Sequence, residues 1–234
     1  MTLADFEILV ADAKHARYAD QICDEMAESA AKRGTGIARR SPGYIIQKME
    51  EGKAVIALHK DGTWAGFCYI ETWSHGEFVA NSGLIVNPEY RKVGLAKAIK
   101  ETIFKLSRKK YPDAKIFGLT TGLAVMKINS DLGYEPVTYS ELTQDEAFWA
   151  GCRSCVNYDI LTSKERKNCM CTAMLYDPAE KATLKAEEFA EELQKRPSLY
   201  ERFMRLKQRI LLRNSEKKNL TLFSGLLALL VKES

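Results

Sequence analysis

Three β-rich segments follow one another between residues 55 and 86 with no helix between them. They are Val55–Leu58, Ala65–Trp73 and Phe78–Val86, and they are separated by the turns Lys60-Asp61-Gly62-Thr63 and Ser74-His75-Gly76-Glu77. Short polar connections that contain glycine join antiparallel neighbours. This succession disfavours a doubly wound sheet of alternating βαβ units. It predicts a mixed, mostly antiparallel central sheet.

Helical patterns flank this sheet. Apolar residues recur at helical spacing over Ala13–Arg33, after a first strand at Phe6–Val10, and Ser41-Pro42 marks the start of a helix that runs to Glu50. The remaining elements expected are a long amphipathic helix with the stripe Leu95, Ile99, Ile103 and Leu106, a strand at Lys115–Thr120, a short helix near Leu123–Leu132, and strands at Pro136–Glu141 and Cys171–Tyr176. The fold class is α/β, of the α+β kind, with helices on the sheet.

Length and composition favour one domain with an appendage. The chain has 234 residues, of which 46% are hydrophobic and 28% are charged, so it is expected to fold. A net charge of +4 is too small to indicate a dedicated nucleic-acid binder. The N-terminal residues do not resemble a signal peptide, and the apolar run Leu220–Val231 is too short to span a bilayer. We expect a cytoplasmic protein without a membrane or nucleic-acid partner.

The C-terminal part has a different character. From Pro178 onward the sequence is helical in pattern and highly charged, so residues 178–234 are predicted to be a helical extension of a domain at residues 1–177. The stretch Leu199–Arg213 is basic, but Glu201 interrupts it and a solvated helix is the simpler interpretation. An apolar stripe is expected to dock on the domain or on a second subunit of a homodimer: Leu220, Phe223, Leu227 and Leu230.

A strand runs into a glycine-containing turn and then into the long helix at residues 84–96. Gly94 lets the backbone approach a ligand closely, and Ala96 keeps the first helical turn small. Unpaired N–H groups and the positive end of the helix dipole suit a phosphate at such a helix start. Arg91 and Lys92 add positive charge beside it. The turn predicts a diphosphate site.

The pattern R-x-x-G-x-A at Arg91–Ala96, after a strand that ends in Asn87-Pro88, resembles motif A of the Gcn5-related N-acetyltransferases. Leu132-Gly133-Tyr134-Glu135-Pro136 resembles the end of motif B of that family, and the similarity covers about residues 4–177. The resemblance implies the fold of that family and an acetyl-CoA co-substrate. It also implies the residues that hold the cofactor: Leu84, Ile85 and Val86 for pantetheine and the thioester, Arg91, Lys92, Val93, Gly94, Leu95 and Ala96 for the pyrophosphate, and Asn129 as a hydrogen-bonding group.

The sequence departs from the family at the catalytic positions. Asn129 stands where many relatives have a tyrosine that protonates the departing thiolate, and a neutral amide cannot act as an acid. The family's glutamate base on the fourth strand would fall near Ala80 or Asn81 and is absent. The catalytic acid and base are therefore unknown, and the remaining candidates are Glu71, His75, Glu77, Ser82 and Tyr134.

The acceptor is predicted to be a primary amine. Ile37-Ala38-Arg39-Arg40-Ser41 before a helix is similar to the acetyltransferase domains of N-acetylglutamate synthases, so a small amino acid such as glutamate is the first candidate. Arg39 or Arg40 could hold its carboxylate through a bidentate fork, or could belong to a solvated basic loop. A protein N-terminus or a lysine side chain is the alternative acceptor.

The region Thr143–Lys167 carries cysteines and is expected to be irregular. Four cysteines form two close pairs in an insertion at about residues 143–170. Cys152-x-x-Cys155 and Cys169-x-Cys171 are 13 residues apart, and four thiolates suit a tetrahedral structural zinc ion. Packing thiols and redox or iron–sulfur chemistry are the alternatives. A zinc-knuckle interaction module that binds CoA without transferring an acyl group is the alternative from a different functional class.

Overall fold

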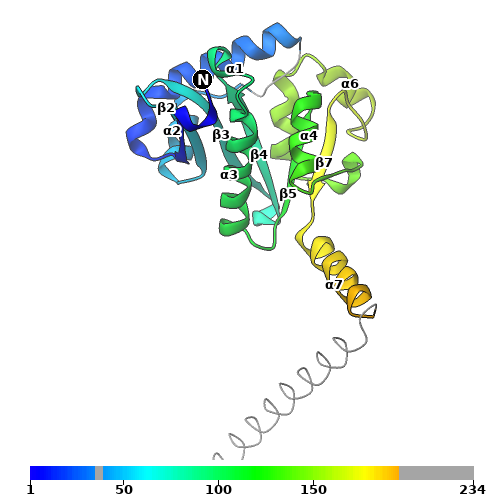
Figure 1. Cartoon of the computed structure of the whole chain (residues 1–234). Helices are drawn as coiled ribbons and strands as arrows, with labels where there is room; N and C mark the ends of the chain where they lie inside the picture. Colours follow the sequence, from blue (N-terminus) through cyan, green and yellow to red (C-terminus); the bar gives the residue numbers. More distant parts are fainter. Residues whose placement is uncertain (35–38, 195–234) are drawn as a thin grey trace, which may run out of the picture. The chain divides into compact units, whose positions relative to one another are not determined.

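The computed structural model describes residues 1–34 and 39–194 (Figure 1). Seven strands are present: β1 Phe6–Val10, β2 Ala54–His59, β3 Trp64–Trp73, β4 Phe78–Val86, β5 Lys115–Thr120, β6 Glu135–Pro136 and β7 Thr172–Tyr176. The α-helices are α1 Ala19–Arg33, α2 Pro42–Glu50, α3 Leu95–Lys110, α4 Leu123–Asp131, α5 Glu146–Ala150, α6 Tyr158–Ser163 and α7 Pro178–Gln194. Short 3-10 turns lie at Leu3–Asp5, Ala13–Tyr18, Ser74–Gly76, Pro88–Tyr90, Tyr139–Glu141 and Gly151–Ser154.

The strands form one sheet in the order β1-β2-β3-β4-β5-β7-β6. Every neighbouring pair is antiparallel except β4 and β5, which are parallel. The connection between these two strands is α3, since a parallel pair needs a crossover. The mixed, mostly antiparallel sheet predicted from the order of segments is confirmed.

One face of the sheet packs against α3, which crosses in front of the central strands in Figure 1. The predicted stripe accounts for this packing, because Leu95, Ile99 and Ile103 are all at most 1% exposed. Side chains at alternate positions of the strands pack against these three residues of α3. Cys68 and Ile70 of β3 are among them. Replacing one of these buried isoleucines by alanine would lower the free energy of unfolding by about 2–5 kcal/mol.

The opposite face carries two separate apolar clusters. Helices α1 and α2 cover one of them, which contains Phe67 and Tyr69 of β3. The insertion with α5 and α6 covers the other, in which Trp149 and Leu161 pack on Phe117 of β5. The apolar packing on this face is therefore divided into two clusters.

Local signals explain where several elements begin. Ser41 accepts a hydrogen bond from the amide of Tyr44 at 3.3 Å, and Pro42 stands at the first helical position, so α2 spans the residues predicted. The predicted helix over Ala13–Arg33 is instead a 3-10 turn followed by α1, which ends at Gly34 in the left-handed conformation.

Two expectations for the later part of the chain are wrong. The strand predicted at Pro136–Glu141 is only the two-residue β6, because Thr138 and Glu141 form a capping box that starts a 3-10 turn. The stretch Thr143–Lys167 is not irregular, since it contains α5, a 3-10 turn and α6. Asp145 caps α5 by accepting a hydrogen bond from the amide of Ala147 at 2.9 Å.

The chain divides into two compact units, Met1–Ala179 and Glu180–Ser234. Only the first part of the second unit, within α7, lies in the described region. The predicted basic stretch at 199–213 and the apolar stripe at 220–230 lie outside the described residues. In the described part of the chain, no helix has the length and hydrophobicity needed to cross a membrane.

A polar network is buried beneath β4, on the face covered by α3. The ammonium of Lys100 is 3.3 Å from Asn81 Oδ1, and the Tyr134 hydroxyl donates to the same oxygen at 3.1 Å. Asn81 Nδ2 donates to Ser107 Oγ at 2.8 Å. Lys100 is only 2% exposed and lies 5.0 Å from the centre of the Tyr134 ring. Burial lowers the pKa of Lys100 from 10.5 to about 8, against a smaller opposing effect of Cys68.

We predict that Lys100→Met stabilises the protein at neutral pH. A lowered pKa means that the folded state disfavours the charged lysine, and a difference of this size corresponds to about 3 kcal/mol. That cost is fully present below pH 8 and disappears as the pH rises from about 8 to about 10.5, because the unfolded chain then binds more protons than the folded one. Denaturant unfolding of both proteins at several pH values measures the difference, which is expected to shrink over this range.

The exposed Lys105 on the same helix is the control. Lys105→Met is expected to change the unfolding free energy by less than about 0.5 kcal/mol. A Lys100→Met protein that is less stable than wild type at pH 7 would contradict the prediction.

Candidate functional site

Strands β4 and β5 pair over only three residues and then part. The last of the three pairs joins Ala80 to Phe117, whereas β4 continues to Val86. The later residues of β5 pair with β7 on its other side. The backbone of β4 from Asn81 onward therefore has an edge from which β5 has separated, and its peptide groups can bond to a ligand that enters there.

A β-bulge bends β4 within this open stretch. Phe67 pairs with Ile85 and Tyr69 with Ser82, so two residues of β4 lie opposite one residue of β3. Gly83 has a φ of +64°, and a side-chain carbon there would lie 2.4 Å from the Tyr69 ring. Only glycine fits this position.

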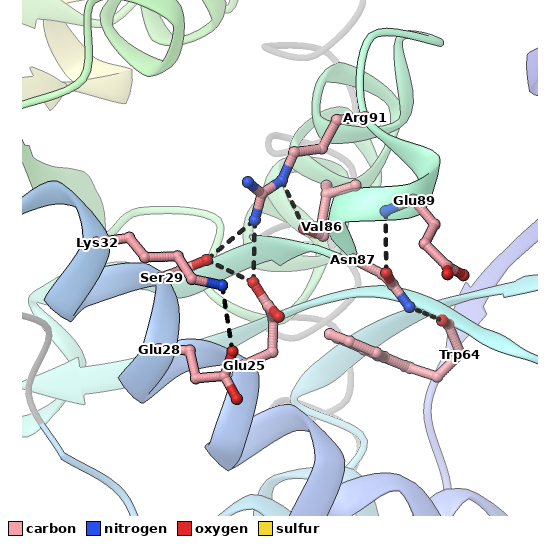
Figure 2. Close-up of polar contacts among 9 residues, drawn as sticks. All are labelled: Glu25, Glu28, Ser29, Lys32, Trp64, Val86, Asn87, Glu89 and Arg91. Carbon is pink, nitrogen blue, oxygen red and sulfur yellow. Dashed lines mark hydrogen bonds and ion pairs between the residues drawn. The ribbon is translucent and has the colours of Figure 1, made fainter.

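The turn after β4 returns the chain from the open end of the strand into α3. Asn87 holds its first part, because Nδ2 donates to the carbonyl of Trp64 at 3.2 Å and Oδ1 accepts from the amide of Glu89 at 3.1 Å (Figure 2). Lys92 has a φ of +69° and Gly94 a φ of +87°, so the backbone reverses sharply before Leu95.

Helix α3 begins at this turn without help from a side chain. Gly94 is its N-cap, and within the described residues no side chain caps it. The first amides of a helix have no partner inside the helix, and the helix dipole makes this end positive. The turn places these donors at the open end of β4, as the predicted diphosphate site requires.

Arg91 is held by the protein itself. Its Nε donates to the carbonyl of Val86 at 3.1 Å, and Nη2 donates to Glu25 at 3.0 Å and to Ser29 at 2.9 Å (Figure 2). Glu25 and Ser29 belong to α1, so the guanidinium ties the turn to that helix. Arg91 is thus paired with Glu25 although its side chain is 44% exposed, and Lys92 is a second exposed cation of the turn.

Asn129 and Tyr134 are enclosed by the protein. Asn129 is 2% exposed, its Nδ2 is 3.7 Å from Met174 Sδ, and its Oδ1 has no partner among the described residues. Tyr134 is 2% exposed, and burial raises its pKa well above 10. These positions do not support a cofactor contact for Asn129 or an acid–base role for Tyr134, which belongs to the buried network of Lys100.

Two further catalytic candidates lie at the end of β4 that is paired with β5. His75 and Glu77 are exposed in the turn between β3 and β4. The strand is paired with β5 at that end, and Leu84 lies seven residues beyond Glu77, about 20 Å along an extended strand. Neither side chain reaches the open stretch where the predicted thioester contacts lie.

Arg40 takes part in a buried cluster between α2 and β3. Its Nη2 is 2.9 Å from Glu71 Oε1, its Nε donates to the Tyr69 hydroxyl at 3.0 Å, and the Tyr44 hydroxyl donates to Glu71 Oε1 at 2.5 Å. Burial and the adjacent Glu71 raise the pKa of Tyr44. Burial disfavours the charge of Arg40, but Tyr69 and Glu71 outweigh it and raise the pKa of the guanidinium.

This cluster changes the prediction for the acceptor site. Arg40 is engaged by Glu71 and Tyr69, so a free fork for a substrate carboxylate is not present there. Arg39 is exposed, and its amide donates to Ser154 Oγ of the insertion at 3.4 Å. Glu71 was recognisable in the sequence as a lone acid in an apolar strand. Its partners were not, because they come from a different element.

The four cysteines of the insertion line one apolar cavity of about 30 Å³. Leu119, Trp149 and Leu161 also line it. The amide of Asn157 donates to Cys155 Sγ at 3.4 Å, and the Tyr139 hydroxyl donates to the carbonyl of Cys171 at 2.8 Å. The two pairs, 13 residues apart in the sequence, thus come together in space.

The zinc prediction is not supported by this arrangement. Across residues 1–34 and 39–194, no group of three or more His, Cys, Asp or Glu side chains is arranged to hold a metal ion. Cys152, Cys155, Cys169 and Cys171 are free thiols that are partly buried against aromatic and aliphatic side chains. Packing thiols were the alternative interpretation of the sequence, and the contacts of Cys152 and Cys169 with the apolar cluster are consistent with it.

Comparison with known proteins identifies the fold. No family model and no curated protein matches the sequence. The structure is similar to N-acetylglutamate synthase from Neisseria gonorrhoeae complexed with coenzyme A and N-acetyl-glutamate, with a TM-score of 0.52 and 16% identity over 74% of this chain. The matched part is 35% of the synthase chain, so this chain spans about a third of that protein.

A second similar structure is a phosphinothricin acetyltransferase of the GNAT superfamily from Sinorhizobium meliloti in complex with acetyl-CoA. The TM-score is 0.50 at 15% identity, over 74% of this chain and 88% of the other. The chain therefore has the fold of the Gcn5-related N-acetyltransferases, as the two sequence motifs indicated.

We predict that the buried thiols react slowly with alkylating reagents. Burial, together with the neighbouring thiols, raises the pKa of Cys152 from 9.0 to about 11 and that of Cys171 to about 12. Because the thiolate is the nucleophile, alkylation of Cys152 by iodoacetamide at pH 8 is expected to be about 100-fold slower than that of an ordinary thiol. Peptide mass spectrometry over time measures this rate, with a cysteine peptide as reference.

Elemental analysis separates packing thiols from a metal site. About one zinc ion per chain, together with thiols that react only after chelation, would contradict the assignment of these cysteines to packing.

Proposed function

We propose that this chain is an acyl-CoA-dependent N-acyltransferase that moves an acetyl group from acetyl-CoA to a primary amine. The observation that carries the proposal is the parting of β4 from β5 directly beside the glycine turn that opens α3. Two similar structures, solved with coenzyme A or acetyl-CoA, support it. The proposal concerns the domain at residues 1–177, with residues 178–234 as a helical extension.

The cofactor would be held chiefly by the backbone. Amides from Lys92 to Ala96 would bond to the pyrophosphate, and each charge-assisted hydrogen bond contributes about 1.5–3 kcal/mol. Leu84, Ile85 and Val86 would offer peptide groups to pantetheine along the open edge of β4. Because Arg91 is paired with Glu25, its role in the proposal is to position the turn.

The transfer requires that the amine attack the thioester carbonyl while the thiolate leaves. Positioning supplies much of the rate, since holding two reactants together replaces a bimolecular encounter. An α-amine with a pKa near 8 needs only about 1.4 kcal/mol to be deprotonated at pH 7. Water can relay that proton. This chemistry does not require the tyrosine that is absent at position 129.

The acceptor proposed first is a small amino acid such as glutamate. The similarity to an N-acetylglutamate synthase supports it, and Arg39 is the exposed cation near the insertion that could hold a carboxylate. A protein N-terminus or lysine is the alternative acceptor. A CoA-release screen over glutamate, other amino acids, polyamines and peptides separates them, and CoA binding without transfer to any amine would favour an interaction module.

We predict that Gly94→Ala weakens CoA binding about 5- to 10-fold. The residue has a φ of +87°, which costs an alanine about 1 kcal/mol, and the added methyl group would stand where the phosphates approach. Isothermal titration calorimetry with CoA measures the effect.

Gly62→Ala is the matched control. Gly62 has a φ of +86° in the turn between β2 and β3, and neither glycine has a neighbour within 4 Å of an added side-chain carbon among the residues described. Both variants are expected to lose similar stability, whereas only Gly94→Ala should lose CoA affinity. Equal CoA affinity in the two variants would argue against the site.

A further inference from the structure

Glu71 lies at the junction of the two apolar clusters on the face of the sheet opposite α3. Along β3, Phe67 and Tyr69 point into the cluster under α1 and α2, whereas Trp73 packs against the cluster under the insertion. Side chains two residues apart share a face, so Glu71 stands on this face between them. It is a buried acidic residue between the two clusters.

The Glu71 carboxylate is buried but only half satisfied. Its side chain is 7% exposed, and both of its donors, Arg40 Nη2 and the Tyr44 hydroxyl, bond to Oε1. No described residue donates to Oε2, and this oxygen keeps a small exposed area in a side chain that is otherwise buried. A carboxylate oxygen can accept two hydrogen bonds, so Oε2 keeps its full capacity for a ligand.

Glu71 Oε2 lies near the residue of β4 at which the open stretch begins. Glu71 pairs with Ala80, which is the last residue of β4 that pairs with β5. Directly opposed side chains in an antiparallel pair have their Cβ atoms about 4.5–5.5 Å apart. Oε2 therefore lies next to the point where the two strands part, on the face away from α3.

The surroundings of Glu71 hold its carboxylate in place and keep Arg40 on Oε1. The Arg40 guanidinium lies 5.1 Å from the centre of the Tyr44 ring and bonds to Tyr69, so it cannot swing onto Oε2 without breaking these contacts. Arg40 is also near Cys152 of the insertion, where its charge opposes the rise that burial causes in the thiol pKa.

We propose that Glu71 is the residue that binds the acyl acceptor, with Oε2 accepting a hydrogen bond from a cationic nitrogen of the amine. This proposal rests on the proposed transferase function and specifies its substrate class: an amine that is positively charged when it binds. Arg40 and Tyr44 are positioning residues, because they act by holding Oε1.

Two substitutions at Glu71 separate charge from shape. Glu71→Gln keeps the size and removes the charge, whereas Glu71→Asp keeps the charge and shortens the side chain. If Oε2 binds a cation, Gln should raise the KM for the amine by about 10- to 100-fold and Asp by less, since a hydrogen bond to a charged group has this strength. If Glu71 only fills space, Glu71→Asp should raise the KM for the amine more than Glu71→Gln does.

The experiment uses the full chain, with acetyl-CoA and whichever of L-glutamate, L-lysine, spermidine and a short free-amine peptide the wild type acetylates best. Calorimetry with CoA is run in parallel, and Kd for CoA is expected to change less than twofold in both variants. Glu77→Gln is the matched control, since Glu77 is exposed at the paired end of β4, and its KM for the amine should equal that of wild type.

The outcomes distinguish the role of Glu71 from the transferase function on which it rests. An unchanged KM in Glu71→Gln, with normal CoA binding and transfer, would overturn the role of Glu71 and leave the transferase function standing. A wild-type chain that does not bind CoA would remove the transferase function and this inference with it.

Discussion

The separation of β4 from β5 after three residue pairs is the feature on which the rest of the site depends. A parallel pair that continued to Val86 would bury the peptide groups of β4 in the sheet and leave none for a ligand. The bulge at Gly83 bends β4 in this open stretch, and the buried network around Asn81 anchors the strand where the pairing ends. Because α3 returns from the same end of β4, its unpaired amides arrive beside the opening.

Most of the cationic side chains that the sequence suggests as ligand-binding groups bond to other residues of the protein. Arg91 is bound to α1 through Glu25 and Ser29, and Arg40 is bound to Glu71 and Tyr69 (Figure 2 shows the first of these). Lys100 is buried beneath β4, where its charge is costly. The phosphate-binding part of the proposed site consequently relies on the helix start and its backbone donors.

The cysteine-bearing insertion contributes through packing. It places Trp149 and Leu161 on the sheet, and it meets the segment before α2 where the Arg39 amide bonds to Ser154. It therefore covers one of the two apolar clusters on the face opposite α3, and Glu71 is the buried acidic residue between these clusters on β3. The Glu71 carboxylate is held there by two donors on Oε1, and Oε2 has no donor among the described residues, so it can accept a hydrogen bond from a ligand.

Much of the architecture follows from local patterns in the sequence. The three consecutive strands, the apolar stripe of α3 and the Ser41-Pro42 start of α2 each depend on neighbouring residues, and the structure reproduces them. The same is true of the glycine turn that opens α3, because its geometry is set within a few residues. The strand at β6 was predicted too long, because the capping box of Thr138 and Glu141 starts a 3-10 turn where the strand pattern continues.

Side-chain roles in the site were decided by tertiary contacts. The sequence identified Arg40, Arg91 and Asn129 as candidate ligands, but whether a charged group is free depends on what lies opposite it, and Glu71, Glu25 and Met174 are 31, 66 and 45 residues away. The sequence by itself determined the fold and the helix start that suits a diphosphate, since local backbone geometry and hydrophobic periodicity are sufficient for both. Only the tertiary structure decided which charges are neutralised and which carboxylate oxygen remains free, because pairing is set by distance in space.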